Sequence, residues 1–563
     1  AFLIIALINN IIFHTSYFYM TPVYLLNLQG INFIFNNISL LSLCFSSLGL
    51  RLYFITSNSE YASFQSDIRV KDIDEKRGNI YDCNGELLVN NEKETVLLVK
   101  PDISTFSIIT EIKGKDFVKD TLMKGYFTVI KTNENVADYN NTNIAKLDTF
   151  KRFSDSTAVH LIGYTDQSNN GVCGIEKYYN KEIKKYSGNL SVAFSADALG
   201  RMLVGEKTEI RDNNYYNSGG INLTIDKTIQ TVTETALKNG KISKGAAVVL
   251  DVETSAIKAV ASTPIYDRNN LVISLNDEDS PFINRAFSAY PVGSVFKTVT
   301  AISALDNNIE FSQIDCKGYT EKSGNIFYCN KRDGHGIIDF KTALSQSCNT
   351  YFIELGTKIG GEALLKTAKK FGFGKAIDIG NGYITESGTL PDLNDLNSDA
   401  AVGNFSFGQG KLTATPLQIA SFYCVIANSG IYNEPFIYSG ITDYNGEYVP
   451  ESQKKGKRIL SKQICETIAE AMLETTKSGT GTMAYSPLFQ TASKTATAQS
   501  GTYDKNGNEI KYSWFVGFFP YEKPEYVICI MKENGSSGGS DGAPVFKEIS
   551  ENIYKYKNNR DIS

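Results

Sequence analysis

Charged residues are missing from the start of the chain, where no Asp, Glu, Lys or Arg occurs before Arg51. The stretch lacks the basic start and small-residue cleavage site of a secretory signal. Its best apolar run is Ile38–Thr56, close to the about 20 residues that cross a bilayer. Residues 1–13 and 17–35 are interrupted by Asn, Gln and Pro. A buried core helix would not need charge to be absent over so long a stretch, so we predict a membrane-anchor region at 1–56 with one span near 38–56.

The rest of the chain carries mixed strand and helix patterns. Residues 57–217 are polar with short apolar runs, and they predict a β-rich pedestal or dimerisation-type domain that opens on a strand–turn–strand pattern at 77–89. Residues 218–563 mix both patterns and predict a larger α+β domain. Strand patterns occur at 219–226, 245–251, 256–262, 512–519 and 526–531, and helical patterns at 227–237, 294–305, 340–346, 362–370, 415–428, 459–475 and 544–556.

Composition narrows the possible partners. The 563 residues allow two to four domains at about 100–200 residues each. The net charge of −5 argues against nucleic acid, which calls for a concentrated basic surface.

The cysteines form no recognisable metal motif. None of the nine is part of a C-x-x-C pair, and only His335 has a cysteine, Cys329, within ten residues. We therefore expect no zinc site, no other metal and no cofactor. Cys316 and Cys329 are close enough in sequence for a loop disulfide, but free or buried thiols fit the odd count better. His335 is expected to be a structural polar residue near Ser347.

A serine and a lysine one turn apart open a strongly apolar predicted helix. In Gly293-Ser294-Val-Phe-Lys297 the two side chains fall on the same helix face. Burial disfavours a charged lysine, and a neutral amine beside a serine is a general base. Ser294 and Lys297 are therefore candidates for nucleophile and base. The same spacing in Ser452-Gln-Lys-Lys455 lies in a charged, soluble run and is set aside.

Two further polar elements are expected if Ser294 is acylated. One is a pair that relays protons and holds a substrate amide, and Ser347-Cys-Asn349 fits its place after an apolar turn. The S-x-N pattern alone is weak, because Ser187-Gly-Asn189 and Ser323-Gly-Asn325 match it too.

The second element is a lysine on a strand beside the nucleophile, where it would bind a substrate carboxylate. Lys341 and Lys366 lie in predicted helices, and Lys477 ends one before a Gly-containing cap. Lys494-Thr-Ala-Thr-Ala498 has β-favouring Thr at alternate positions and is followed by a turn and the apolar strand 513–518. Lys494 is therefore the predicted strand lysine.

The order Ser-x-x-Lys, Ser-x-Asn, Lys-Thr-x resembles the penicillin-recognising serine acyltransferases. Further stretches resemble class B, monofunctional penicillin-binding proteins, which are peptidoglycan transpeptidases. The resemblance implies a membrane anchor, a β-rich pedestal and an extracytoplasmic transpeptidase domain, with a five-stranded antiparallel sheet between helices and a helical subdomain. The matching stretches begin at Arg77, His160, Gly174, Leu223, Ala261, Asn284, Gly334, Gly408, Trp514 and Ala543.

The resemblance also implies roles for the first two motifs. Ser294 attacks the D-Ala-D-Ala carbonyl of a stem peptide and releases the terminal D-Ala. Lys297 takes the serine proton, and Ser347 and Asn349 complete the relay and hold the substrate amide. An amine of a neighbouring stem peptide then takes the acyl group, and β-lactams would trap Ser294.

On the third motif, the resemblance implies that Lys494 and Thr495 bind the terminal carboxylate. The backbone N–H groups of Ser294 and Thr497 would form the oxyanion hole. Ala496 stands where the family usually has Gly, which adds a methyl group beside the cleft and affects acylation or β-lactam fit. The resemblance further implies a SEDS-type membrane glycosyltransferase as partner.

Alternative functions remain. A β-lactamase or carboxypeptidase relative would need a water-activating carboxylate, and no Glu-x-x-Leu-Asn pattern follows Asn349. A mainly non-catalytic scaffold or activator of the glycosyltransferase is separated from a transpeptidase by the effect of Ser294→Ala. A penicillin sensor would need a cytoplasmic signalling domain, for which the sequence before Ile38 offers no pattern. Division, elongation and sporulation are not distinguished.

Overall fold

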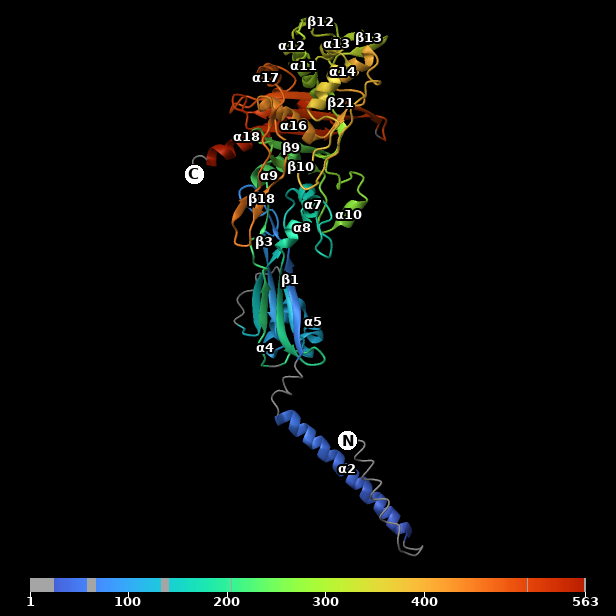
Figure 1. Cartoon of the computed structure of the whole chain (residues 1–563), viewed down its shortest axis with the longest axis vertical. Coiled ribbons are helices and arrows are strands. Elements are labelled where there is room, and N and C mark those ends of the chain that lie inside the picture. The colour runs from blue at the N-terminus through green and yellow to red at the C-terminus, as the bar shows by residue number, and fades with distance from the viewer. Residues whose placement is uncertain (1–24, 58–66, 133–140, 204, 504, 561–563) are drawn as a thin grey trace. The chain divides into compact units, whose positions relative to one another are not determined.

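The computed structural model describes residues 25–57, 67–132, 141–203, 205–503 and 505–560. They fall into two compact units that interleave along the chain (Figure 1). The smaller unit comprises Ala1–Ile73, Val96–Leu147 and Ser191–Arg211, and the larger one the remainder. The proposed domain boundaries at 56 and 217 stay predictions, since neither unit is one continuous segment.

The smaller unit contains the long helix α2 (Leu25–Ser57). Among the described residues, α2 alone is long and apolar enough to cross a membrane, in its stretch Asn37–Phe54. The side chains of that stretch are exposed to the surroundings of the protein. This position agrees with the predicted span at 38–56. The weaker segments 1–13 and 17–24 lie outside the described residues.

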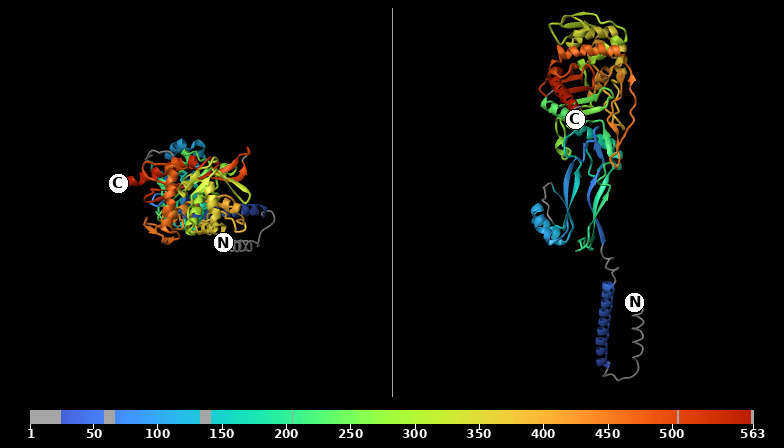
Figure 2. Two further views of the ribbon diagram at one scale, coloured as in Figure 1. Left: turned by 90° about the horizontal axis from the view of Figure 1, so that it is seen from above. Right: turned by 90° about the vertical axis from the view of Figure 1, so that its left-hand side faces the viewer.

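Short sheets and two helices form the rest of this region. One sheet has the order β4 (Thr128–Thr132), β3 (Glu92–Val99), β5 (Ile144–Lys151), and the other β1 (Asp67–Lys76), β6 (Gly188–Ala196), β7 (Glu209–Asn213). Helices α4 (Ile103–Lys113) and α5 (Lys115–Asp120), with the turn η1 (Leu122–Lys124), pack apolar side chains against β3 and β4 (Figure 2). The sequence predicted the strands of this region but not its helices.

A five-stranded antiparallel sheet organises the larger unit. Its order is β10 (Ile257–Thr263), β9 (Gly245–Asp251), β23 (Tyr526–Glu533), β22 (Glu509–Phe519), β21 (Ala492–Tyr503). Side chains alternate between its faces, so that Val248 packs into one core and Val249 into another. Helices α9 (Lys227–Asn239) and α18 (Ala543–Arg560) cover the second face, and α16 (Pro416–Ala427) covers the first (Figure 1). This sheet confirms the predicted fold.

A helical subdomain lies beyond the edge strand β21 (Figure 1). Its helices are α11 (Lys297–Asp306), α12 (Phe340–Ser345), α13 (Asn349–Ile359), α14 (Gly361–Lys370), α15 (Asp399–Ser406) and α17 (Lys462–Lys477). Four short strands complete it: β12 (Ile314–Cys316) pairs with β15 (Gly336–Ile338), and β13 (Tyr319–Lys322) with β14 (Asn325–Tyr328). The patterns predicted α11, α12, α14 and α17 but missed α13 and α15.

A third sheet in the larger unit has the order β19 (Tyr448–Pro450), β18 (Tyr438–Thr442), β8 (Gly220–Leu223), β2 (Asn79–Tyr81). Shorter elements connect these layers. The remaining ones are α6 (Val159–Ile162), α7 (Gly174–Tyr178), α8 (Asn180–Lys185), α10 (Leu271–Leu275), β11 (Tyr290–Pro291), η2 (Gly293–Phe296), β16 (Thr413–Ala414), β17 (Ile431–Tyr432), β20 (Lys457–Arg458), η3 (Thr482–Ala484) and η4 (Gly538–Gly542).

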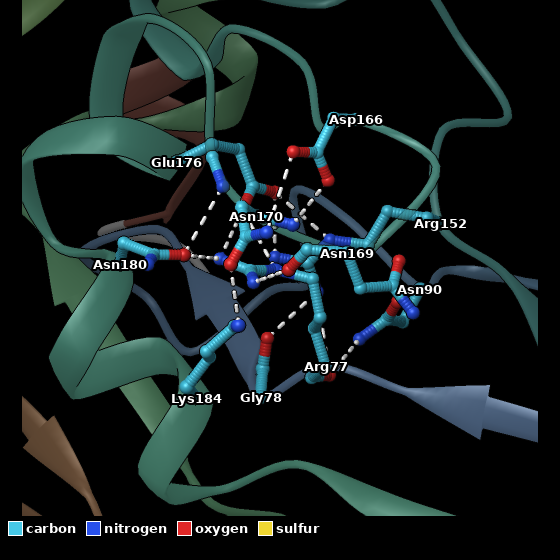
Figure 3. A network of polar contacts seen from close by, with 11 residues as sticks. Arg77, Gly78, Asn90, Arg152, Asp166, Asn169, Asn170, Glu176, Asn180 and Lys184 are labelled. Atoms are coloured by element: carbon cyan, nitrogen blue, oxygen red, sulfur yellow. Dashed lines mark hydrogen bonds and ion pairs between the residues drawn. The ribbon is translucent and has the colours of Figure 1, made fainter.

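A buried ion-pair network joins two of the stretches that carried the family resemblance (Figure 3). Glu176, at the start of α7, pairs with Arg77 at 3.0 Å and with Arg152 at 2.6 Å. Arg77 also donates to the side chain of Asn180 and to the backbone carbonyl of Asn169. The Arg77 and Glu176 side chains are almost fully buried, which a charge tolerates only when it is paired. The Arg77 stretch therefore has a structural role.

Candidate active site

Ser294 lies in the short turn η2 that leads into α11. Gly293 has a left-handed φ of 63°, and a Cβ there would lie 3.0 Å from the Cβ of Ala498 on β21. Its N–H donates to the carbonyl of Gly408 at 2.9 Å. The glycine that precedes the serine thus lets the turn pack directly against the edge strand β21. Ser294 itself is half-buried beside that strand.

Lys297, the first residue of α11, is completely buried. Its Nζ donates to the carbonyl of Ser347 at 2.6 Å, to Oδ1 of Asn349 at 2.7 Å and to Oγ of Ser347 at 3.2 Å. Burial lowers the pKa of Lys297 to about 8, although the nearby thiols of Cys348 and Cys329 act in the opposite direction. The amine is therefore close to neutrality at physiological pH, as a general base requires.

Ser347 occupies the bend between α12 and α13 with a left-handed φ of 56°. A residue with a side chain adopts this conformation at a cost of about 1–3 kcal/mol, and such residues cluster at functional sites. The bend turns Oγ of Ser347 toward two lysines, Lys297 at 3.2 Å and Lys494 at 3.1 Å. The hydroxyl therefore connects the amine beside the nucleophile to the amine on the strand.

Lys494 is buried on β21, where its Nζ also donates to the carbonyl of Thr495 at 2.9 Å. Burial, together with the charge of Lys297, holds the pKa of Lys494 well below its usual range. Lys341 and Lys366 lie in α12 and α14 as predicted, and Lys477 is exposed at the end of α17. Among the four candidates, Lys494 has a recorded contact with the Ser347 side chain.

The third motif continues along the same edge strand. The Oγ1 of Thr495 lies 2.5 Å from Oγ1 of Thr480, a contact that the sequence analysis missed. Thr480 follows the rejected Lys477-Ser-Gly match, and its N–H donates to the carbonyl of Ser345 at 3.1 Å. Thr497 is exposed and pairs with Ser513 across the ladder to β22.

Printed contacts thus join four of the predicted residues, Lys297, Ser347, Asn349 and Lys494, in one buried network. Ser294 joins it along the chain, one turn before Lys297. Trp514, expected in the core, is fully buried and donates from Nε1 to the carbonyl of Pro291 at 2.9 Å.

The cysteines lie differently from what their spacing suggested. Cys316, Cys329, His335 and Cys348 offer ligand atoms that all lie within 4.8 Å of one another. All three of these cysteines are free and buried, so the loop disulfide between Cys316 and Cys329 is not formed. Because the fold gathers these side chains from separate elements, sequence spacing is no longer a ground for expecting no metal.

Comparison with known families identifies the larger unit. Residues 245–551 match the family described as the penicillin-binding protein transpeptidase domain. The chain belongs to this family. The match covers the five-stranded sheet and every candidate site residue from Ser294 to Thr497.

Individual relatives agree with a class B penicillin-binding protein. The chain is 29% identical over 557 residues to the peptidoglycan D,D-transpeptidase MrdA of Acinetobacter baumannii, covering 85% of the chain and 80% of the relative. It is 29% identical over 412 residues to the stage V sporulation protein D of Bacillus subtilis, covering 69% and 61%. The class B resemblance read from the motifs is confirmed.

Solved structures support the fold. The penicillin-binding protein PBP2 in complex with MreC from Helicobacter pylori matches with a TM-score of 0.63 and 25% identity, covering 87% of this chain and 99% of that one. A D,D-transpeptidase domain from Eggerthella lenta matches with a TM-score of 0.63 and 24% identity, covering 86% and 99%. Together with α2, the relatives are consistent with a membrane-anchored penicillin-binding protein.

Proposed function

We propose that this chain is a peptidoglycan D,D-transpeptidase that cross-links stem peptides through an acyl-enzyme on Ser294. The observation that carries this proposal is the shared hydroxyl of Ser347, which lies within hydrogen-bond reach of both Lys297 and Lys494. Two buried lysines of lowered pKa around one serine hydroxyl form a proton relay with no evident structural purpose.

The reaction runs in two halves. Neutral Lys297 takes the proton of Ser294 as Oγ attacks the carbonyl carbon of the penultimate D-Ala. The tetrahedral intermediate collapses, the C–N bond to the terminal D-Ala breaks, and a proton returned through Ser347 makes that D-Ala leave as an amine. An amine of a second stem peptide then attacks the ester, releases Ser294 and forms the cross-link.

Binding groups surround this centre. Lys494 and Thr495 hold the terminal carboxylate of the donor peptide, and Asn349 holds its amide. The N–H groups of Ser294 and Thr497 stabilise the oxyanion, which the packing of η2 on β21 supports. β-Lactams imitate the D-Ala-D-Ala dipeptide and acylate Ser294 without a leaving group that diffuses away.

The same proposal covers location and partners. Residues 1–56 anchor the protein with a single span near 38–56, residues 57–217 form the pedestal, and residues 218–563 form the catalytic domain outside the cytoplasm. The partner is a SEDS-type membrane glycosyltransferase that supplies glycan strands. The support is the apolar stretch Asn37–Phe54 and the class B relatives.

Covalent labelling tests the catalytic assignment. The full chain in detergent is incubated with a labelled penicillin, and its intact mass is measured. One adduct is expected, on the peptide that contains Ser294. It disappears in Ser294→Ala and persists in Ser452→Ala, the matched control from the discarded Ser-x-x-Lys. Absence of an adduct, or an adduct that survives Ser294→Ala, refutes the acyl-enzyme. Loss of cell function in Ser294→Ala separates catalysis from a purely scaffolding role.

A further inference from the structure

Four potential metal ligands converge beside the Ser347 bend. Cys316 ends β12, Cys329 follows β14, His335 precedes β15, and Cys348 precedes α13. The pairing of β12 with β15 sets Cys316 opposite Gly336, next to His335. The three cysteines are at most 2% exposed, so their thiols face the interior.

The backbone around this cluster is unusually close. Gly318 and Gly334 both have left-handed φ values, 88° and 81°. A Cβ on Gly334 would lie 2.1 Å from the carbonyl oxygen of Cys316. Only glycines permit this approach, which brings the segment of Cys316 against the segment of His335.

The distances between the ligand atoms are those of a tetrahedral zinc site. Nδ1 of His335 lies 3.4 Å from Sγ of Cys316 and 3.5 Å from Sγ of Cys329, and the thiols of Cys329 and Cys348 are 3.6 Å apart. With Zn–S of about 2.3 Å and Zn–N of about 2.0–2.1 Å, tetrahedral geometry requires about 3.6 Å between S and N and about 3.8 Å between S and S. A disulfide would need two sulfurs at about 2.05 Å.

The ligand types select the metal. Three thiolates and one imidazole in tetrahedral array form one of the common structural zinc sets, whereas carboxylate-preferring ions such as magnesium would avoid it. Four protein ligands leave no open position for water, so the site is structural rather than catalytic. The Oγ1 of Thr350 lies 3.1 Å from Sγ of Cys348 and can donate to that thiolate, which orients it.

The cluster is built into the catalytic motif. Cys348 stands between Ser347 and Asn349, the two residues that contact Lys297. The Nδ2 of Asn349 donates at 3.0 Å to the carbonyl of Tyr328, the residue before Cys329. Fixing Cys348 and Cys329 to one point therefore fixes both the backbone and the side-chain partner of Asn349.

We propose that Cys316, Cys329, His335 and Cys348 bind one zinc ion, and that this ion positions Ser347 and Asn349 for acylation. The ion ties the β12–β15 and β13–β14 strands to the start of α13. The positioning part rests on the proposed function, whereas zinc binding does not.

Metal content tests the site. The full chain is purified in detergent without chelator, and zinc is measured by mass spectrometry of the element. We expect about one zinc per chain in the wild type and in Cys424→Ala, a matched control that removes another buried free thiol. Cys316→Ser and His335→Ala are expected to lose it. A wild-type protein without zinc overturns the site.

Two measurements on the wild type keep this test independent of the folding of variants. Replacement of zinc by cobalt is expected to give the thiolate-to-metal absorption of a tetrahedral cobalt site. Alkylation of the unfolded chain in EDTA without reductant is expected to modify Cys316, Cys329 and Cys348 alike. A disulfide among them, or a cobalt spectrum without thiolate bands, refutes the ligand set.

Acylation kinetics test the positioning role. Removal of zinc by EDTA is expected to lower the rate constant of penicillin acylation about tenfold or more, because small displacements of catalytic groups cost such factors. Non-covalent penicillin affinity changes less, and added zinc restores the rate. Cys316→His, which keeps a zinc ligand, is expected to retain more activity than Cys316→Ser. Unchanged acylation in zinc-free folded protein overturns positioning, and zinc-bound protein that never acylates refutes the proposed function but not the metal site.

Discussion

Acylation of Ser294 is predicted to follow the protonation of Lys297. Burial lowers the pKa of this amine to about 8, and the thiols of Cys348 and Cys329 act in the opposite direction. The other cation facing the site, Lys494, has a pKa well below its usual range because of burial and the charge of Lys297. Only the neutral amine accepts the serine proton, so the rate rises with pH and levels off above the pKa.

The lowered pKa fixes the size of the rise. With a pKa of about 8, the neutral fraction of Lys297 goes from about one tenth at pH 7 to about nine tenths at pH 9, a gain of about tenfold. An amine with the ordinary pKa of 10.5 would gain about a hundredfold over this interval without levelling. A zinc ion on the neighbouring thiolates cancels their charge and can move the midpoint only to lower pH.

The assay is the second-order rate constant for acylation by a fluorescent penicillin, measured on the full chain from pH 6 to pH 9.5. Lys477→Ala is the control, since this lysine is exposed and outside the network, and its profile should overlay that of the wild type. Thermal melts across the range exclude unfolding as a cause. A rate that climbs about a hundredfold between pH 7 and pH 9, or a flat profile, refutes Lys297 as the base.

Two other changes have definite expected outcomes. Lys494→Ala should reduce the acylation rate at least a hundredfold because it removes the carboxylate-binding amine and a donor to Ser347, whereas Lys477→Ala should leave it unchanged; the reverse result would place the catalytic lysine on the wrong strand. Glu176→Gln leaves two buried guanidinium groups without their carboxylate and should lower the free energy of unfolding by about 3–5 kcal/mol in chemical denaturation. Glu278→Gln, which breaks an exposed pair with Lys505, is its control and should change nothing measurable.

The catalytic sheet and network could be predicted because local signals agreed with the global fold. Alternation at 245–251 and 512–519 indicated strands, and the β-favouring threonines around Lys494 distinguished it from three lysines of similar sequence. The choice depended on element type, since a lysine in a helix or at a helix end could not reach Ser347 from the sheet edge.

Other parts carried no such signal. Helix α13 begins directly after Cys348 in a segment that was read as a motif rather than a helix, and its cap is a cysteine without a side-chain cap bond. The contact of Thr480 with Thr495 depends on how the end of α17 meets β21, which is a tertiary relation. Sequence spacing cannot report such meetings.

The left-handed bend at Ser347 explains why catalytic and metal-binding residues can alternate in one short motif. A regular helix would place residues 347 and 348 about 100° apart on one surface. With φ at 56°, the Ser347 hydroxyl faces the two lysines while the next side chain, Cys348, faces the thiols and His335. The strain of the bend needs compensation from its surroundings. A zinc ion bound to Cys348 would supply it at the residue beside the strained one, so loss of the ion should relax the bend and separate Ser347 from both amines.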